Sequence, residues 1–333
     1  MLANMIYAVD THTMGEPTRV VTGGIEVIPE AMMVDKKNYA ACQLDDIRKA
    51  LMQEPRGHKE MFGSIIVEPS TPAADLGVIF MDGEGYLDMC GHGLIGTITV
   101  ALETGIIENY KSGRLITIDT PAGLVYATAE YQHGSVLSVS FRNVPSFLYQ
   151  QAFPVKLKGR ETFLVDIAYG GNYFALVEAS DLDLRIDSDN RNKISSLGMC
   201  ILHKLQKSID IEHPHSNEAQ YVKLVEFCDE SRITESHARN AVVFGNGQID
   251  RSPCGTGTCA KMATLYAKGK LKLGEAFIHE SIIGTTFRGR LLEEVQIGSI
   301  RAVIPEITSR AFITSIQEFK IHPDDPLKYG FSL

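Results

Sequence analysis

Short apolar stretches bounded by Gly, Pro or Asp recur through both halves of the 333-residue chain. Some alternate between apolar and polar positions, others are continuous, and β-branched and aromatic residues are frequent in them. This pattern predicts strands. The predicted strands cover residues 63–69, 74–81, 114–120, 123–131, 135–141, 162–170, 172–179, 221–227, 240–247, 299–307 and 310–321.

Helical spacing of apolar residues is found in fewer places, at 39–53, 94–104, 194–209 and 260–267. Two of these segments follow glycine clusters and end close to Gly105 and Gly269, which is typical of helix termination. A strand-rich chain with few helices, rather than regular βαβ alternation, predicts an α+β fold with mainly antiparallel sheets.

The two glycine clusters resemble each other, which indicates a weak internal repeat. The first, at 88–93, reads Asp-Met-Cys-Gly-His-Gly, and the second, at 250–258, reads Asp-Arg-Ser-Pro-Cys-Gly-Thr-Gly-Thr. Each cluster joins a predicted strand to a small apolar helix, and each has a cysteine just before Gly-x-Gly. A chain of this length exceeds one ordinary core. We therefore expect two related domains, with one copy of the motif in each.

Composition narrows the function classes. The net charge of −9 argues against nucleic acid and anionic membranes as partners, because both select basic surfaces. No apolar run is long enough to span a membrane, and the first residues lack the pattern of a signal peptide. The six cysteines are dispersed and form no CxxC pair, so we expect free thiols in the cytoplasm and no structural zinc.

Cys90 and Cys254 are the candidate reactive groups because each lies at the predicted start of a helix. Unpaired backbone N–H groups there favour a thiolate and lower a cysteine pKa. The same N–H groups can bind a carboxylate. If the two sites face one substrate, one thiolate removes the proton beside the carboxylate, and the opposite thiol returns a proton on the other face. The sequence thus predicts a cofactor-independent racemase or epimerase.

Other interpretations of these motifs stay open at this point. Both could be tight glycine turns with buried cysteines, since a single Gly-x-Gly is a weak signal. A phosphate-binding loop is disfavoured because 254–258 lacks the GxxxxGK[ST] pattern. A nucleophilic pair of Cys90 with His92 would leave Cys254 unexplained, and such enzymes usually bring the histidine from a distant segment.

The segments MCGH (89–92) and DRSPCGTGT (250–258) resemble the proline racemase family, which includes 4-hydroxyproline 2-epimerases and trans-3-hydroxyproline dehydratases. The resemblance runs the length of the chain. It includes DTHTMGEPTRVV (10–21), EPRGHKEMFGSII (54–66), NVPSFLY (143–149), YGGNYFALV (169–177), GTTFRGRLLEE (284–294) and DPLKYGF (325–331).

This resemblance implies two pseudo-symmetric domains of the diaminopimelate-epimerase type, each a curved sheet around a central helix. We expect residues 1–128 with 316–333 to form the N-terminal domain and 129–315 the C-terminal domain, with the active site in the cleft between them. The resemblance also implies a homodimer that uses neither pyridoxal phosphate nor a metal.

The resemblance assigns residues to the active site. Cys90 and Cys254 match the two catalytic bases of the family. Backbone N–H groups that match the carboxylate site belong to Gly91, His92, Gly255 and Thr256. Asp250, together with His92, matches the residues near the substrate nitrogen.

Four positions bear on reaction and substrate. The dehydratase branch carries Thr at the second cysteine position, so Cys254 favours inversion. Phe62 and Phe244 match aromatic pocket residues of the racemase branch, and Leu224 replaces a polar residue that is typical of hydroxyproline epimerases. An apolar pocket leaves a 4-hydroxyl unpaired, at a cost of about 1–3 kcal/mol. We therefore predict proline as the substrate, with 4-hydroxyproline as the alternative and a non-catalytic amino-acid-binding protein as the second.

Overall fold

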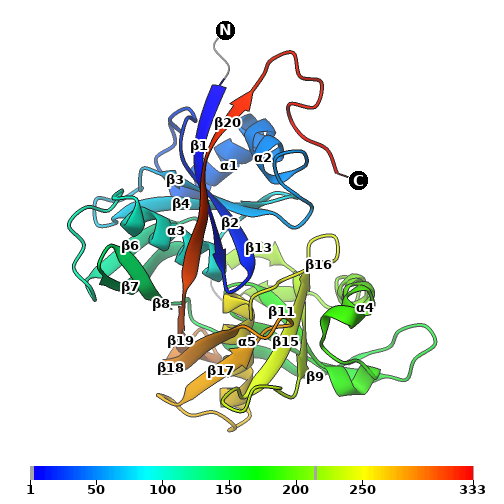
Figure 1. Ribbon diagram of the computed structural model, residues 1–333. Helices are drawn as coiled ribbons and strands as arrows, with labels where there is room; N and C mark the ends of the chain where they lie inside the picture. Colours follow the sequence, from blue (N-terminus) through cyan, green and yellow to red (C-terminus); the bar gives the residue numbers. More distant parts are fainter. Residues whose placement is uncertain (1–3, 214–215, 333) are drawn as a thin grey trace. The chain divides into compact units, whose positions relative to one another are not determined.

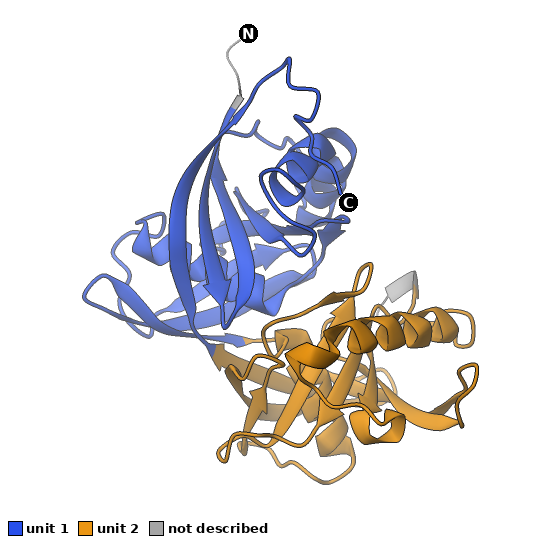
Figure 2. Ribbon diagram, turned by 45° about the vertical axis from the view of Figure 1, so that its right-hand side comes forward, with its two compact units in different colours: residues 1–141, 309–333 blue, residues 142–308 orange. Residues whose placement is uncertain are grey.

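The chain folds into two compact units in the computed structural model, which describes residues 4–213 and 216–332. One unit comprises residues 1–141 and 309–333, and the other comprises residues 142–308 (Figure 2). The limits expected from the sequence, 128/129 and 315/316, differ from these by several residues. The first would cut through strand β7 (Gly123–Gln132), which a two-residue turn joins to β8 (Ser135–Arg142), and the second would cut through β20 (Ala311–Ile321).

Unit 1 is a sheet with one internal helix and two outer helices (Figure 1). Its further strands are β1 (Asn4–Thr13), β2 (Glu16–Gly23), β3 (Phe62–Val67), β4 (Leu76–Asp82), β5 (Tyr86–Leu87) and β6 (Leu115–Thr120). Its helices are α1 (Met33–Gln43), α2 (Asp45–Met52) and α3 (Gly91–Glu103). Helix α3 contacts β1, β2, β3 and β20, and every residue from Gly91 to Leu102 is buried. This full burial explains why α3 is apolar on all sides.

Unit 2 has the same plan. Its strands are β9 (Phe147–Val155), β10 (Phe163–Tyr169), β11 (Tyr173–Glu178), β12 (Ile211–His213), β13 (Ser216–Gln220), β14 (Leu224–Asp229), β15 (Ala238–Phe244), β16 (Gln248–Ile249), β17 (Ala276–Glu280), β18 (Thr286–Ile297) and β19 (Ile300–Ser309). Its helices are η1 (Ala179–Leu182), η2 (Ser188–Asn190), α4 (Arg191–Leu205) and α5 (Gly255–Ala267). Helix α5 contacts β9, β10, β11 and β18, whereas α4 packs on β14 and β15.

The strand pairings repeat in the same order in both units. In unit 1 the pairs β1–β2, β3–β4 and β6–β7 are antiparallel, and β2–β3 and β4–β6 are parallel. In unit 2 the pairs β10–β11, β14–β15 and β17–β18 are antiparallel, and β11–β14 and β15–β17 are parallel. The outer helices lie in the first parallel crossover, and α3 or α5 lies in the second. The internal repeat predicted from two short motifs therefore extends to the whole architecture.

Most of the predicted elements are present, and one helix is divided. All eleven predicted strands lie on observed strands, and 94–104, 194–209 and 260–267 lie on α3, α4 and α5. The helix predicted at 39–53 is instead two helices, α1 and α2, because Leu44 leaves the helical conformation at φ −118°. Among the described residues, no helix has the length and apolar character needed to cross a membrane.

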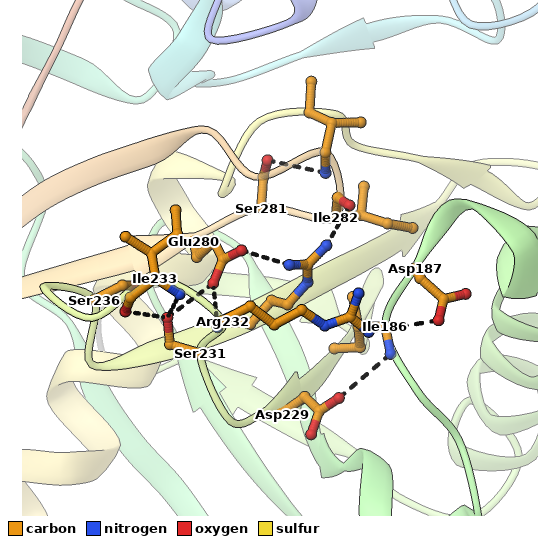
Figure 3. A network of polar contacts seen from close by, with 12 residues as sticks. Ile186, Asp187, Asp229, Ser231, Arg232, Ile233, Ser236, Glu280, Ser281 and Ile282 are labelled. Atoms are coloured by element: carbon orange, nitrogen blue, oxygen red, sulfur yellow. Dashed lines mark hydrogen bonds and ion pairs between the residues drawn. The ribbon is translucent and has the colours of Figure 1, made fainter.

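A buried ion pair fixes the end of β17 in unit 2. Glu280 pairs with Arg239 of β15, and its other oxygen accepts hydrogen bonds from the hydroxyl of Ser231 and the backbone N–H of Arg232, both at 2.8 Å (Figure 3). Both side chains are nearly inaccessible, at 1% for Glu280 and 6% for Arg239. Removing one partner of this buried pair would leave an uncompensated charge between β15 and β17.

Candidate active site

Cys90 is the N-cap residue of α3 in unit 1. Its backbone is extended, with φ −146° and ψ 125°, and its sulfur accepts a hydrogen bond from the N–H of Gly93 at 3.4 Å. The side chain is 8% exposed. Helix starts leave several N–H groups without intrahelical partners, so Gly91 and His92 supply donors beside the sulfur.

His92 lies against the Cys90 thiol. Its Nδ1 is 3.3 Å from Sγ, and the ring of Phe62 stands edge-on to the imidazole with centroids 4.4 Å apart. Burial lowers the pKa of His92 to about 3, so the ring is neutral at physiological pH. The structure therefore brings three predicted residues of unit 1, Cys90, His92 and Phe62, into one cluster.

The second glycine of the first motif, Gly93, is required by the space around it. A Cβ at this position would lie 3.1 Å from the rings of Phe62 and Phe80 and 3.3 Å from the sulfur of Cys90. These distances are shorter than ordinary van der Waals contacts. Glycine is needed here because the aromatic rings and the thiol share the space beside the helix start.

Cys254 precedes α5 in unit 2 but has a different backbone conformation. Its φ of 60° with ψ of 111° is rare for a residue with a side chain, and such conformations cost about 1–3 kcal/mol and concentrate at functional sites. The sulfur lies 3.7 Å from the hydroxyl of Thr256, and the residue is 6% exposed. Gly255 and Thr256 form the first turn, so the helix begins five residues earlier than the predicted 260–267.

A short hydrogen-bond chain holds Cys254 in this conformation. Oδ1 of Asp250 accepts bonds from the N–H and the hydroxyl of Ser252, at 2.8 and 2.7 Å. The hydroxyl oxygen of Ser252 in turn accepts the N–H of Cys254 at 3.1 Å. Burial raises the pKa of Asp250 to about 6, although the bonds from Ser252 oppose the shift. Asp250 therefore shapes the turn that carries the cysteine.

The thiol of Cys254 is less acidic than the sequence predicts. We expected the helix start to lower its pKa, but burial, together with the carboxyl groups of Asp250 and Glu226, raises the pKa well above the usual value. The hydrogen bond from Gly257 and the hydroxyl of Thr256 act in the expected direction and are outweighed. Without substrate, Cys254 is a thiol at neutral pH.

The two remaining predicted pocket residues lie at strand ends in unit 2. Leu224 is the first residue of β14 and packs against the small apolar cluster that contains Cys254 and Ala260. Phe244 is the last residue of β15 and pairs with Gln248 of β16. Cys259, interpreted from the sequence as a small helix-packing residue, has no exposed surface.

Sequence reasoning missed two buried polar residues around the start of α5. Glu226 of β14 and His279 of β17 both have no exposed surface, and the Nε2 of His279 lies 3.7 Å from Oε1 of Glu226. Each is an ionisable residue inside a mostly apolar stretch, in the segments YVKLVEF and AFIHE, and this pattern could have indicated them. Within the described part of the chain, no three His, Cys, Asp or Glu side chains are grouped to hold a metal ion.

Comparison with known proteins identifies the family: the family model for proline racemase matches residues 8–332. The chain belongs to the proline racemase family. A proline racemase from Acetoanaerobium sticklandii is 48% identical over 329 residues, which cover 98% of both chains. A trans-3-hydroxy-L-proline dehydratase from Bacillus cereus is 41% identical over the full length of both chains. A hydroxyproline epimerase structure from Agrobacterium vitis, with bound trans-4-hydroxy-L-proline, has a TM-score of 0.91 at 32% identity, covering 99% of this chain and 96% of that one.

Membership of the proline racemase family confirms the resemblance inferred from the two cysteine motifs. The high TM-score confirms the α+β fold of the diaminopimelate-epimerase type. Relatives named racemase or epimerase are isomerases, so the prediction of an isomerase is also confirmed.

Proposed function

We propose that this protein is a proline racemase in which Cys90 and Cys254 act on opposite faces of the α-carbon. The observation that carries the proposal is the repeated arrangement of a buried cysteine directly before a buried, glycine-rich helix, once in each unit. A two-base inversion needs two such groups of similar reach, one to accept a proton and one to donate it.

The proposed carboxylate site uses the backbone of both helix starts. Gly91 and His92 begin α3, and Gly255 and Thr256 begin α5. First-turn N–H groups lack intrahelical acceptors and attract anions. They would also stabilise the negative charge that spreads onto the carboxylate as the α-proton leaves. This chemistry supplies the electron sink within the protein and requires no pyridoxal phosphate or metal.

The proposed proton transfer requires one cysteine to be a thiolate and the other a thiol. The raised pKa of Cys254 favours its thiol form, which is the form that donates a proton. The neutral His92 ring beside Cys90 is able to accept a hydrogen bond from that thiol or donate one to its thiolate. As inversion proceeds, the proton leaves the α-carbon for one sulfur, and the other sulfur delivers its proton to the opposite face.

Proline is the proposed substrate because the pocket residues are apolar. Phe62 is 3% exposed and Leu224 belongs to the apolar surroundings of Cys254, and Phe244 is the third proposed member. None of the three offers a hydrogen-bond partner to a 4-hydroxyl group. Inversion is favoured over dehydration because Cys254 retains a thiol where the dehydratase branch of the family has Thr.

The substrate choice predicts a measurable preference. We expect kcat/KM for L-proline to exceed that for trans-4-hydroxy-L-proline by about 10-fold or more, since burying an unpaired hydroxyl costs about 1–3 kcal/mol. Chiral chromatography of both reactions gives the two rates. A preference for the hydroxylated substrate would instead make the protein a 4-hydroxyproline 2-epimerase.

A matched variant tests whether Leu224 carries this preference. Leu224→His adds a hydrogen-bonding group at the position, and it should move the ratio of the two kcat/KM values toward hydroxyproline. Leu148→His is a suitable control, because Leu148 packs against the same apolar cluster but is not a proposed pocket residue. Equal shifts in both variants would remove Leu224 from the specificity pocket.

We also propose that the protein is a cytoplasmic homodimer. The family resemblance supports the homodimer, and the six free cysteines suit a reducing compartment. Size-exclusion chromatography with light scattering tests the oligomeric state, and a monomer at micromolar concentration would contradict it.

A further inference from the structure

Glu226 is a fully buried carboxyl group within the apolar strand β14. Its Oε1 accepts a hydrogen bond from the Nδ2 of Asn240 at 3.3 Å and lies 3.7 Å from Nε2 of His279. Its Oε2 has no hydrogen-bond partner among the residues that the structure describes. Burying a carboxyl oxygen without a partner is unfavourable, so this group requires an explanation beyond packing.

The unpaired oxygen lies at the start of α5, close to Cys254. A Cβ at Gly257 would be 2.5 Å from Oε2 of Glu226 and 3.3 Å from Sγ of Cys254. The carboxyl group and the thiol therefore flank the same point, which no side chain fills because residue 257 is glycine. The glycine in the second motif serves this approach in addition to any contact with substrate.

Other ionisable groups around Glu226 come from several elements of unit 2. Thr258 donates to or accepts from the Nδ1 of His279 at 3.0 Å, and this ring stays neutral because burial lowers its pKa to about 3. The remaining groups that interact electrostatically with Glu226 or its neighbours are Glu178 of β11, Cys228 of β14, Asp250 after β16, and Cys254, Cys259 and Lys261 of the α5 region.

Lys261 is the cation among these residues, and its ammonium group points to Glu178 rather than to Glu226. Its Nζ lies 3.2 Å from Oε1 of Glu178, and burial, which would lower its pKa, is outweighed by Cys228 and the carboxylates of Glu178 and Glu226. Lys261 thus offsets part of the charge of Glu226 without forming a described hydrogen bond to it. The negative charge of Glu226 remains available to act on Cys254.

We propose that Glu226 is a positioning residue that holds Cys254 in its thiol form through the close approach of its unpaired carboxyl oxygen. This inference rests on the proposed function, since it gives Cys254 the state of a proton donor. In this proposal Glu226 acts on Cys254 alone, by making a further negative charge at the helix start unfavourable.

The direction of the effect follows from electrostatics. Burial raises the pKa of Glu226 to about 7, so the group gains its charge as the pH rises through neutrality. That charge opposes ionisation of Cys254 above pH 7. Removing it makes the thiolate easier to form, and the two groups titrate as a coupled pair.

The test is the pH dependence of Cys254 alkylation in Glu226→Gln, measured without substrate. Iodoacetamide modification is followed by mass spectrometry with fragment ions that separate Cys254 from Cys259. We expect the midpoint of the rate–pH curve to move about 1–2 pH units lower than in the unchanged protein, as for a unit charge removed at this range. The pH optimum of kcat/KM for proline inversion should move in the same direction.

Two further variants serve as controls for this test. Glu280→Gln removes another buried carboxylate from unit 2, in the network of Figure 3, and should leave the alkylation midpoint unchanged. Glu226→Asp retains the charge and should keep the midpoint near that of the unchanged protein. An unshifted midpoint in Glu226→Gln, or an equal shift in Glu280→Gln, would overturn the inference. If the midpoint shifts but the unchanged protein inverts no proline, the proposed function fails and the electrostatic link between Glu226 and Cys254 stands.

Discussion

Replacing Cys90 or Cys254 with serine is expected to slow proline inversion at least ~10³-fold, because each removes one partner of the proton transfer. Serine has nearly the shape of cysteine, but its hydroxyl is a far weaker acid and its alkoxide does not form at neutral pH. Both cysteines are buried, at 8% and 6% exposure, so the substitutions leave the surface unchanged. Chiral chromatography of proline after incubation with each variant measures the loss.

Cys259→Ser is the matched control for these variants. Cys259 lies one turn into α5 and has no exposed surface, and burial raises the pKa of its thiol to about 12. We expect this variant to retain inversion within a few-fold of the unchanged protein. Near-full activity in Cys90→Ser or Cys254→Ser would exclude a two-base assignment for that residue.

Deuterium incorporation separates the enzyme from a protein that only binds an amino acid. In heavy water, a two-base mechanism places solvent deuterium on the α-carbon of the product, because the donating sulfur carries an exchangeable proton. A binding protein would bind proline and incorporate none. Mass spectrometry of the recovered proline distinguishes these outcomes even where the rate is low.

The repeated helix starts were predictable because local residue chemistry determines them. Glycines after Cys90 and Cys254 allow close packing, and Gly105 and Gly269 follow the helices with positive φ values of 79° and 70°. These signals lie within a few residues of the elements they define. Because these signals are local, the sequence alone predicts the central helices and hence the repeat, without any knowledge of strand pairing.

Tertiary effects explain what the sequence did not predict. Strands β1 and β2 were missed because they carry polar residues such as Thr11 and Arg19, which are buried only through strand pairing and tertiary contacts. Arg19, for example, pairs with Asp10 at 2.8 Å and donates to the carbonyl of Leu51 at 2.6 Å. The division between α1 and α2 also carries no Gly or Pro signal at Leu44.

The acidity of Cys254 illustrates why a local rule can fail in a buried site. A helix start contributes about 0.3–2 kcal/mol to stabilising a negative charge. Burial and two carboxyl groups act against the thiolate by more than this: Asp250 lies four residues before Cys254, whereas Glu226 lies far from it in the sequence. Glu226 is contributed by β14 and comes beside the thiol only through the folding of unit 2.

Gly170 is the second position where we expect a large effect, because it lies against the backbone of the helix that follows Cys254. It follows β10, and its carbonyl accepts the Nδ2 of Asn143 at 2.8 Å. A Cβ at this position would lie 2.1 Å from the carbonyl oxygen of Thr256 and 2.7 Å from the backbone nitrogen of Ala260. Neither atom belongs to a flexible side chain, so relief requires a movement of α5 itself.

Gly170→Ala is therefore expected to lower the free energy of unfolding by about 3 kcal/mol, at the upper end for overpacked sites, and to lower Tm by roughly 10 °C. The folded fraction should also lose about 10²-fold in inversion rate, since small displacements of catalytic groups are that costly. Gly85→Ala is the control, because a Cβ there meets nothing within 4 Å and, as at Gly170, φ is not positive. Calorimetry and the inversion assay measure both effects. An unchanged Tm with full activity in Gly170→Ala would contradict this prediction. It would show that the start of α5 can move without any loss of stability or activity.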